Sequence, residues 1–140
     1  MATLKAIYDH ESGQAPVQVR TQGELEALIE RVRACSTGYP CPAVVDITVM
    51  DDPRGFPRLY AGIGEDRGYV HELPPGGQAR ATAGDREATG VVIYDLQGHE
   101  LEVPANQEVS LSVVRAVLSA YLTCDGTIPA DQPGLQLVGA

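Results

Sequence analysis

The chain has 140 residues, enough for one domain with a buried core, and 44% of them are hydrophobic, which argues against wholesale disorder. Nineteen acidic residues against ten basic ones give a net charge of -9, which argues against nucleic acid or an anionic membrane surface as a direct partner. No apolar run approaches the roughly 18 residues of a membrane span, and the first nine residues lack the long apolar segment of a signal peptide. We therefore expect one cytosolic domain covering residues 1–140.

The first elements are two short strands and a helix. Residues 4–8 and 16–20 have strand character, and a turn at 12–14 would join them as a hairpin. Thr21 and Glu24 then have the spacing of a capping box, and apolar residues recur at helical spacing behind them. The pattern predicts a helix over 22–34, with Glu30 and Arg33 paired on its polar face.

The middle of the chain is rich in strand signals. Residues 43–49 are mostly β-branched and predict a central strand, and 58–63 with 69–73 predict a hairpin. The glycines between these two strands resemble a phosphate-binding loop, but the third comes one residue late and a strand follows instead of a helix. Glu65 and Asp66 would also repel a phosphate, so the glycines are interpreted as turn residues.

The remainder predicts a short edge strand within 79–87, a hairpin of 89–94 with 99–103, and a second helix. Ser110 is the expected cap of that helix and Gly126 its end. The tail 127–140 would add a terminal strand at 135–138 or be partly mobile. This order favours an α+β fold, an antiparallel meander of about six to eight strands with two helices on one face.

The sequence offers little for catalysis or metal binding. His99 and Glu100 begin like a zinc-protease motif, but Val103 stands where the second histidine belongs. Cys35, Cys41 and Cys124 are an odd, sparse set that fits reduced thiols, although Cys35 and Cys41 could meet as a disulfide. No zinc-ligand spacing occurs, so no metal and no cofactor are expected. The alternatives that remain are a small-molecule enzyme using His99 with nearby carboxylates, and a generic oligomeric adaptor domain.

Two pairs of adjacent acids, Asp51–Asp52 and Glu65–Asp66, stand in predicted turns. They can be calcium ligands, solvated turn residues or a negative patch for a partner, and no loop has the calcium-binding pattern. If the two turns share one end of the sheet, four like charges lie near Tyr60 and Tyr69. Tyrosine beside carboxylates is a common composition of protein interfaces.

Several short motifs, taken in order, carry a family resemblance. They are Tyr8-Asp9-His10-Glu11, the helix at 21–32, Leu59-Tyr60-x-Gly62-x-Gly64 with Arg67-Gly68, and Val92-Ile93-Tyr94-Asp95 with Gly98-His99-Glu100. Over residues 4–126 the chain resembles an immunity protein of bacterial polymorphic toxin systems, of the actinobacterial family usually encoded beside deaminase-type toxins. Nine arginines against one lysine fit a GC-rich actinobacterial genome. The chain has no tryptophan, whereas members of this family tend to end in a tryptophan-bearing strand.

The resemblance implies a non-enzymatic binding protein in the cytosol that neutralises one cognate secreted toxin by covering its active site. A toxin that acts on nucleic acid is often basic near that site, and an acidic inhibitor would be steered to it. We expect a monomer or weak homodimer with no nucleic-acid or membrane partner. The candidate contact residues, from charge and loop placement, are Glu65, Asp66, Asp51, Asp52, Tyr60 and Tyr69.

Overall fold

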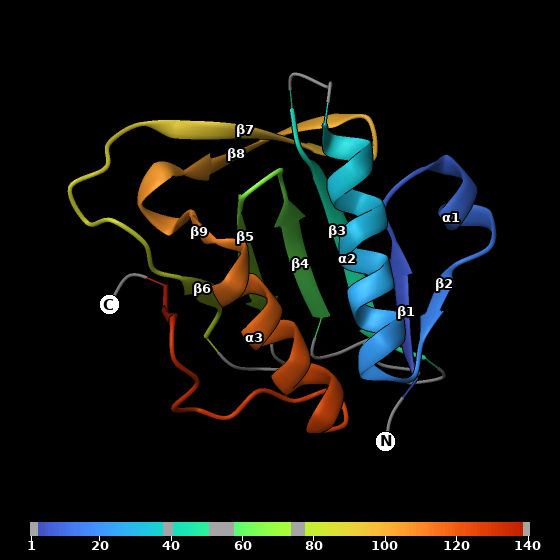
Figure 1. Cartoon of the computed structure of the whole chain (residues 1–140). Coiled ribbons are helices and arrows are strands. Elements are labelled where there is room, and N and C mark those ends of the chain that lie inside the picture. Colours follow the sequence, from blue (N-terminus) through green and yellow to red (C-terminus); the bar gives the residue numbers. More distant parts are fainter. Residues whose placement is uncertain (1–2, 38–40, 51–57, 74–77, 139–140) are drawn as a thin grey trace.

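The computed structural model of the chain describes residues 3–37, 41–50, 58–73 and 78–138. Within them, ten strands form one sheet and two long helices lie side by side on one of its faces (Figure 1). The predicted α+β class is confirmed, with a larger sheet than expected. Asp51 and Asp52 lie outside the described residues.

The chain opens with strand β1 (Leu4–Ile7), helix α1 (His10–Gln14) and strand β2 (Val17–Val19). The two strands pair antiparallel, as predicted, but a short helix replaces the simple turn. Asp9 and Ser12 explain this helix. The Asp9 carboxylate accepts from the Ser12 amide at 2.8 Å, and the Ser12 hydroxyl accepts from the Asp9 amide at 3.0 Å. This reciprocal capping box fixes a first helical turn.

Helix α2 (Gln22–Ser36) begins where its capping signal predicts. The Thr21 hydroxyl accepts from the Glu24 amide at 3.1 Å. The Glu24 carboxylate does not return to Thr21 but accepts from the Arg20 amide at 2.9 Å. Only the half of the capping box in which Thr21 accepts from Glu24 therefore forms. At its other end, the helix runs two residues beyond the expected end at residue 34.

The central strands depart from a simple meander. Strand β3 (Ala43–Val49) pairs with β1 on one side and with β4 (Arg58–Ile63) on the other. Both β2 and β3 are antiparallel to β1, so they run parallel to each other with β1 between them. This arrangement follows from α2, which carries the chain back along the sheet before β3 starts (Figure 1).

Strand β5 (Arg67–Leu73) pairs with β4 and leads to the far edge of the sheet. There β6 (Arg80–Thr82) and β10 (Leu135–Leu137) follow, so the expected terminal strand forms. The strand order is β10-β6-β5-β4-β3-β1-β2.

Helix α3 (Leu111–Thr123) lies beside α2 on the same face. It follows a 3-10 turn (Ala105–Gln107) and a two-residue strand, β9 (Val109–Ser110), which pairs with β5. Ser110 occupies the N-cap position of this helix, as predicted, but without the expected side-chain bond. Its hydroxyl lies 2.8 Å from that of Ser112, and its side chain makes no capping bond.

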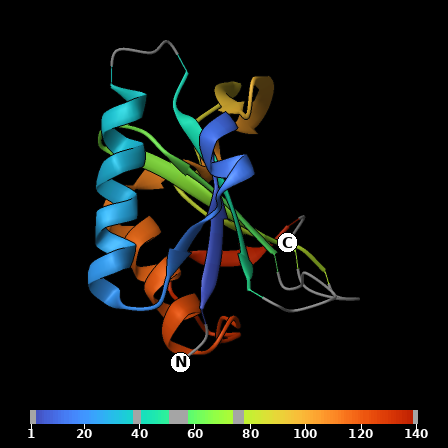
Figure 2. The same ribbon diagram turned by 90° about the vertical axis from the view of Figure 1, so that its right-hand side faces the viewer.

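The opposite face of the sheet is covered by a hairpin of β7 (Val91–Leu96) and β8 (His99–Pro104). Figure 2 shows α2 on one side of the sheet and this hairpin on the other. Its turn is only two residues long, with φ values of 51° at Gln97 and 91° at Gly98. The pair matches a type I′ turn, whose twist suits a hairpin.

The two faces enclose separate hydrophobic cores. The smaller one, under the hairpin, contains Val44, Tyr69, Tyr94 and Val103. The Tyr69 and Tyr94 rings meet edge to face with centroids 4.9 Å apart. Gly62 lies directly beneath them, and a Cβ atom there would overlap both rings. The glycine is therefore required by close packing and not by a phosphate.

The larger core lies between the sheet and the helices. Its fully buried side chains come from both helices and from strands β1 to β5, and they include Leu4, Leu25, Ile29, Ile47, Leu59, Ile63, Leu118 and Leu122.

A buried ion pair holds the tail to the sheet. Arg80 Nε lies 2.6 Å from Glu72 Oε1, and Glu72 is 3% exposed. The other two guanidinium nitrogens donate to the carbonyls of Ile128 and Pro129, both at 2.9 Å. One arginine thus ties β5, β6 and the segment leading to β10 together.

Candidate functional site

The turn between β4 and β5 presents two carboxylates at the surface. Glu65 and Asp66 are both exposed, and the Gly64 amide donates to the Arg67 carbonyl at 2.9 Å to close the turn. Among the described residues, neither carboxylate has a hydrogen-bond or ion-pair partner. Both charges are therefore available to a binding partner.

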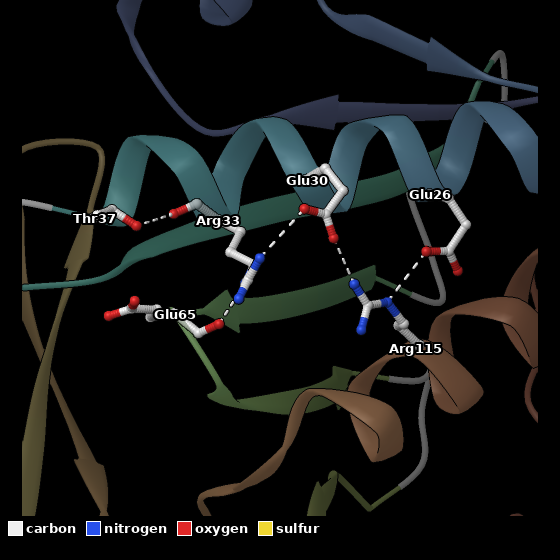
Figure 3. Close-up of polar contacts among 6 residues, drawn as sticks. All are labelled: Glu26, Glu30, Arg33, Thr37, Glu65 and Arg115. Carbon is white, nitrogen blue, oxygen red and sulfur yellow. Dashed lines mark hydrogen bonds and ion pairs between the residues drawn. The ribbon is translucent and has the colours of Figure 1, made fainter.

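The backbone of this turn, in contrast, is held by both helices. The Arg33 guanidinium of α2 donates to the Glu65 carbonyl, and the Leu111 amide of α3 donates to the Asp66 carbonyl at 3.2 Å. Figure 3 shows the Glu65 carboxylate directed away from Arg33 while its carbonyl is held. A turn fixed in this way loses little conformational entropy when it binds.

Arg33 is itself part of a wider network (Figure 3). It pairs with Glu30 at 3.5 Å, which confirms the predicted contact on α2. Glu30 also accepts from Arg115 of α3 at 2.6 Å, and Arg115 contacts Glu26 at 3.1 Å. These contacts join the two helices to the turn.

A second group of acids lies on the outward face of the β7–β8 hairpin. Asp95 pairs directly with Glu100, and Glu102 lies two residues further along β8. All three are exposed. Like charges directly opposite on neighbouring strands destabilise a sheet, and neither β7 nor β8 contains a lysine or arginine to offset them.

Pro42 brings the two acidic groups to the same end of the molecule. Its carbonyl accepts from the Asp95 amide at 2.8 Å. A Cβ atom on Gly64, beside Glu65, would lie 3.5 Å from the Pro42 ring. We call the exposed side chains of Glu65, Asp66, Asp95, Glu100 and Glu102 the acidic end.

Glu108 links the β4–β5 turn to the β7–β8 hairpin beneath the acidic end. One carboxylate oxygen accepts from the Tyr94 hydroxyl at 2.8 Å, and the other lies 3.3 Å from Arg67 Nε. Arg67 follows Asp66 in the turn, and Tyr94 precedes Asp95 in the hairpin. Burial, together with the hydrogen bond to Glu108, raises the pKa of Tyr94 above its usual range. Its hydroxyl therefore stays protonated and donates to the carboxylate.

Of the two tyrosines predicted to contact a partner, Tyr69 is buried and Tyr60 is half-buried. Tyr69 is 0% exposed, and its hydroxyl is buried without a partner among the described residues. Burial raises the pKa of this hydroxyl. Tyr69 therefore cannot anchor a partner in this structure, because both faces of β5 are covered. Tyr60 is half-buried, with the Arg58 guanidinium 5.8 Å from its ring centre.

The sequence leaves open whether the two acidic turns share one end of the sheet, and Asp51 and Asp52 lie outside the described residues. Val49 and Arg58 flank residues 51–57, whereas the Glu65 turn follows Ile63 at the other end of β4. Asp95, Glu100 and Glu102 are acids at the surface that the sequence pattern does not single out. Their pairing depends on a two-residue turn, which Asp95-Leu96-Gln97-Gly98 does not specify clearly.

The enzyme alternative finds no support in the geometry. His99 is exposed beside the hairpin turn, and it lines neither the surface pocket bordered by Thr82 and Gln107 nor the one bordered by Tyr8 and Ser12. The larger pocket, of about 500 Å³, has Arg86 as its one charged lining residue among those described. No three His, Cys, Asp or Glu side chains in the described ranges come together as metal ligands.

A generic oligomeric adaptor domain would expose an extensive apolar patch. Among the described residues, the exposed large hydrophobic side chains are Val91, Leu137 and Val138. The last two are neighbours at the tail and the first lies on the hairpin, so they do not cover a helix face.

All three cysteines are free, including Cys35 and Cys41.

The structure thus defines an α+β protein with a cluster of exposed carboxylates at one end. Comparison with protein families gives a more specific identification, because residues 13–137 match the family "Immunity protein Imm1". The chain belongs to this family of non-enzymatic toxin inhibitors. No curated protein matches the chain. No helix within the described residues is long and apolar enough to cross a membrane.

Proposed function

We propose that the chain neutralises a nucleic-acid-directed toxin domain of the deaminase type by placing its acidic end over the toxin's active site. Membership of the Imm1 family supports a toxin as the partner. The observation that supports the surface is the rigid display of Glu65 and Asp66, whose backbone is held while their carboxylates stay unpaired among the described residues. The nearby Arg33 and Arg67 are engaged with Glu30 and Glu108.

Charge explains how such a surface would select its partner. A domain that acts on nucleic acid needs a basic substrate site, and a surface with five carboxylates complements it. Electrostatic steering raises association rates by about 10- to 1,000-fold and weakens with salt. The inhibitor acts as a monomer or weak homodimer in the producing cell's cytosol, and light scattering tests the oligomeric state.

The direct test is binding to the toxin domain encoded next to this chain. Co-purification, together with protection of the nucleic acid from that domain, is the expected result. A toxin domain that neither binds nor is inhibited would overturn the proposal.

The surface itself is tested by charge reversal. Glu65→Lys with Asp66→Lys should slow association about tenfold at low salt, and should reduce its dependence on salt. The control reverses Glu87 and Asp131, which are exposed elsewhere and change the net charge by the same amount. An equal effect in both variants would mean that only total charge matters, and would contradict a role for this turn.

A further inference from the structure

Strand β8 has a partner on one side only. Among the described residues it pairs with β7 and with no other strand. The Ala105 amide donates to the Gly90 carbonyl at 3.0 Å, so Gly90 and Ala105 are a hydrogen-bonded pair at the end of the β7–β8 ladder. Along an antiparallel ladder, residues whose backbone groups bond to the partner strand alternate with residues whose backbone groups point away from it. Glu100 and Glu102 therefore direct their backbone N–H and C=O groups to the free edge.

The other side of the hairpin is already occupied. The bond from the Asp95 amide to the Pro42 carbonyl, at 2.8 Å, attaches β7 to the start of β3. The Tyr94 hydroxyl bound to Glu108 braces the hairpin against the body of the protein. The free edge of β8 is thus the outer rim of a fixed element.

Side chains on this rim carry one sign of charge. Glu100 and Glu102 are exposed, and Asp95 lies directly across from Glu100. Charged residues on an edge strand normally prevent pairing with another sheet. Acids on both partners would indeed repel a second copy of this chain. They would attract a strand that carries lysine or arginine, so the same charges that block self-pairing favour a basic partner.

We infer that β8 receives an extended, basic segment of the cognate toxin as an additional strand. This inference rests on the proposed function and adds to it the part of the toxin that is recognised. The N–H and C=O groups of Glu100 and Glu102 supply four backbone hydrogen bonds. Pro104 has no N–H, so it limits pairing at the end of β8. Lysine or arginine at alternate positions of the segment would face the two glutamates.

Amide hydrogen exchange on the complex with the neighbouring toxin domain tests this directly. The Glu100 and Glu102 amides should exchange quickly in the free protein and become protected in the complex. Leu137 provides an internal control. The Val138 amide bonds to Ala79, so the Leu137 amide faces the free edge of β10 and should stay unprotected. A complex that leaves both glutamate amides unprotected overturns the inference while the proposed function stands, and no complex at all overturns both.

A matched pair of substitutions separates backbone pairing from charge. Glu102→Pro removes the carboxylate and the outward N–H but none of the bonds to β7, whereas Glu102→Gln removes only the charge. The proline variant should bind the toxin domain roughly five- to tenfold more weakly than the glutamine variant. Equal affinities would contradict strand addition. Thermal melting of both variants checks the fold, and the exchange experiment on the unsubstituted chain decides the matter if the proline variant is unstable.

Discussion

Arginine side chains join distant parts of this molecule in two different settings. At the tail, Arg80 and Glu72 have side chains that are 13% and 4% exposed. Between the helices and the β4–β5 turn, Arg33 and Glu30 are 42% and 53% exposed. The chemistry is the same, but burial changes its consequence. Removing one partner of the buried pair should destabilise the fold, because a lone buried charge is costly, whereas the exposed network mainly sets where the turn lies.

Breaking the buried pair should have the largest effect. Arg80→Ala leaves the Glu72 carboxylate buried without its partner and releases two carbonyls of the tail. We expect the free energy of unfolding to fall by about 3–5 kcal/mol, measured by urea denaturation. The double variant with Glu72→Leu removes the stranded charge and should recover part of the loss. An Arg80→Ala variant as stable as the original chain would show that the pair has no structural role.

Two buried tyrosines, Tyr69 and Tyr94, allow a similar comparison with smaller expected changes in stability, because one buried hydroxyl has no partner among the described residues and the other has one. Tyr69→Phe removes a hydroxyl that has no partner among the described residues and should raise stability by about 1 kcal/mol. Tyr94→Phe removes a hydroxyl bound to Glu108 and should lower stability by a similar amount. Chemical denaturation of the two variants side by side distinguishes them. Changes of the same sign would contradict the assigned hydrogen bonding.

A half-buried histidine, His71, extends the comparison to pH. Burial lowers the pKa of His71 below its ordinary value of 6.5, while its ring nitrogen bonds to Gln107 at 2.7 Å. Between these two pKa values the unfolded chain binds more protons than the folded chain. Stability should therefore fall as the pH drops from 6.5 to the lowered value, and then level off.

Urea midpoints at several pH values between 7 and 5 measure this effect of His71. His71→Gln should reduce the pH dependence, and His99→Gln, at an exposed position, should leave it intact. A slope that survives in the His71 variant would assign it to other groups.

Weakening the exposed network should have the smallest effect on stability. Arg33→Ala removes a partly solvated pair and should change the free energy of unfolding by about 0.5 kcal/mol or less. It also frees the Glu65 carbonyl, so association with the toxin should slow. Arg115→Ala is the control, because it breaks contacts to Glu26 and Glu30 but leaves the turn held. Equal association rates for both variants would mean that Arg33 does not position the turn.

Local signals in the sequence were enough to predict most elements. The Thr21 cap with its helical apolar spacing defined α2, and the β-branched run at 43–49 defined β3. Helix α1 was missed because Asp9 and Ser12 form a capping box without the usual glutamate. The order of strands was also missed, since nothing local indicates that β1 lies between β2 and β3.

The candidate site was harder to predict, for a related reason. Exposure of Glu65 and Asp66 follows from their turn, which the glycines mark. The burial of Tyr69 does not, because alternation within β5 cannot show that a hairpin covers its second face. The contribution of Asp95 and Glu100 to the acidic end depends on Gln97 adopting a positive φ. Glutamine rarely has a positive φ, so the sequence does not predict this turn.

The position of β1 between β2 and β3 also has a consequence for timing. Leu4 pairs with Val19 on one side and with Val49 on the other, so 30 further residues must be synthesised after β2 before the second edge of β1 can be filled. At roughly 5–20 residues per second, that delay lasts about 1.5 to 6 seconds. During it the nascent β1–β2 hairpin presents an open edge on the ribosome. Once β3 has emerged and paired with β1, this edge can no longer pair with a neighbouring chain.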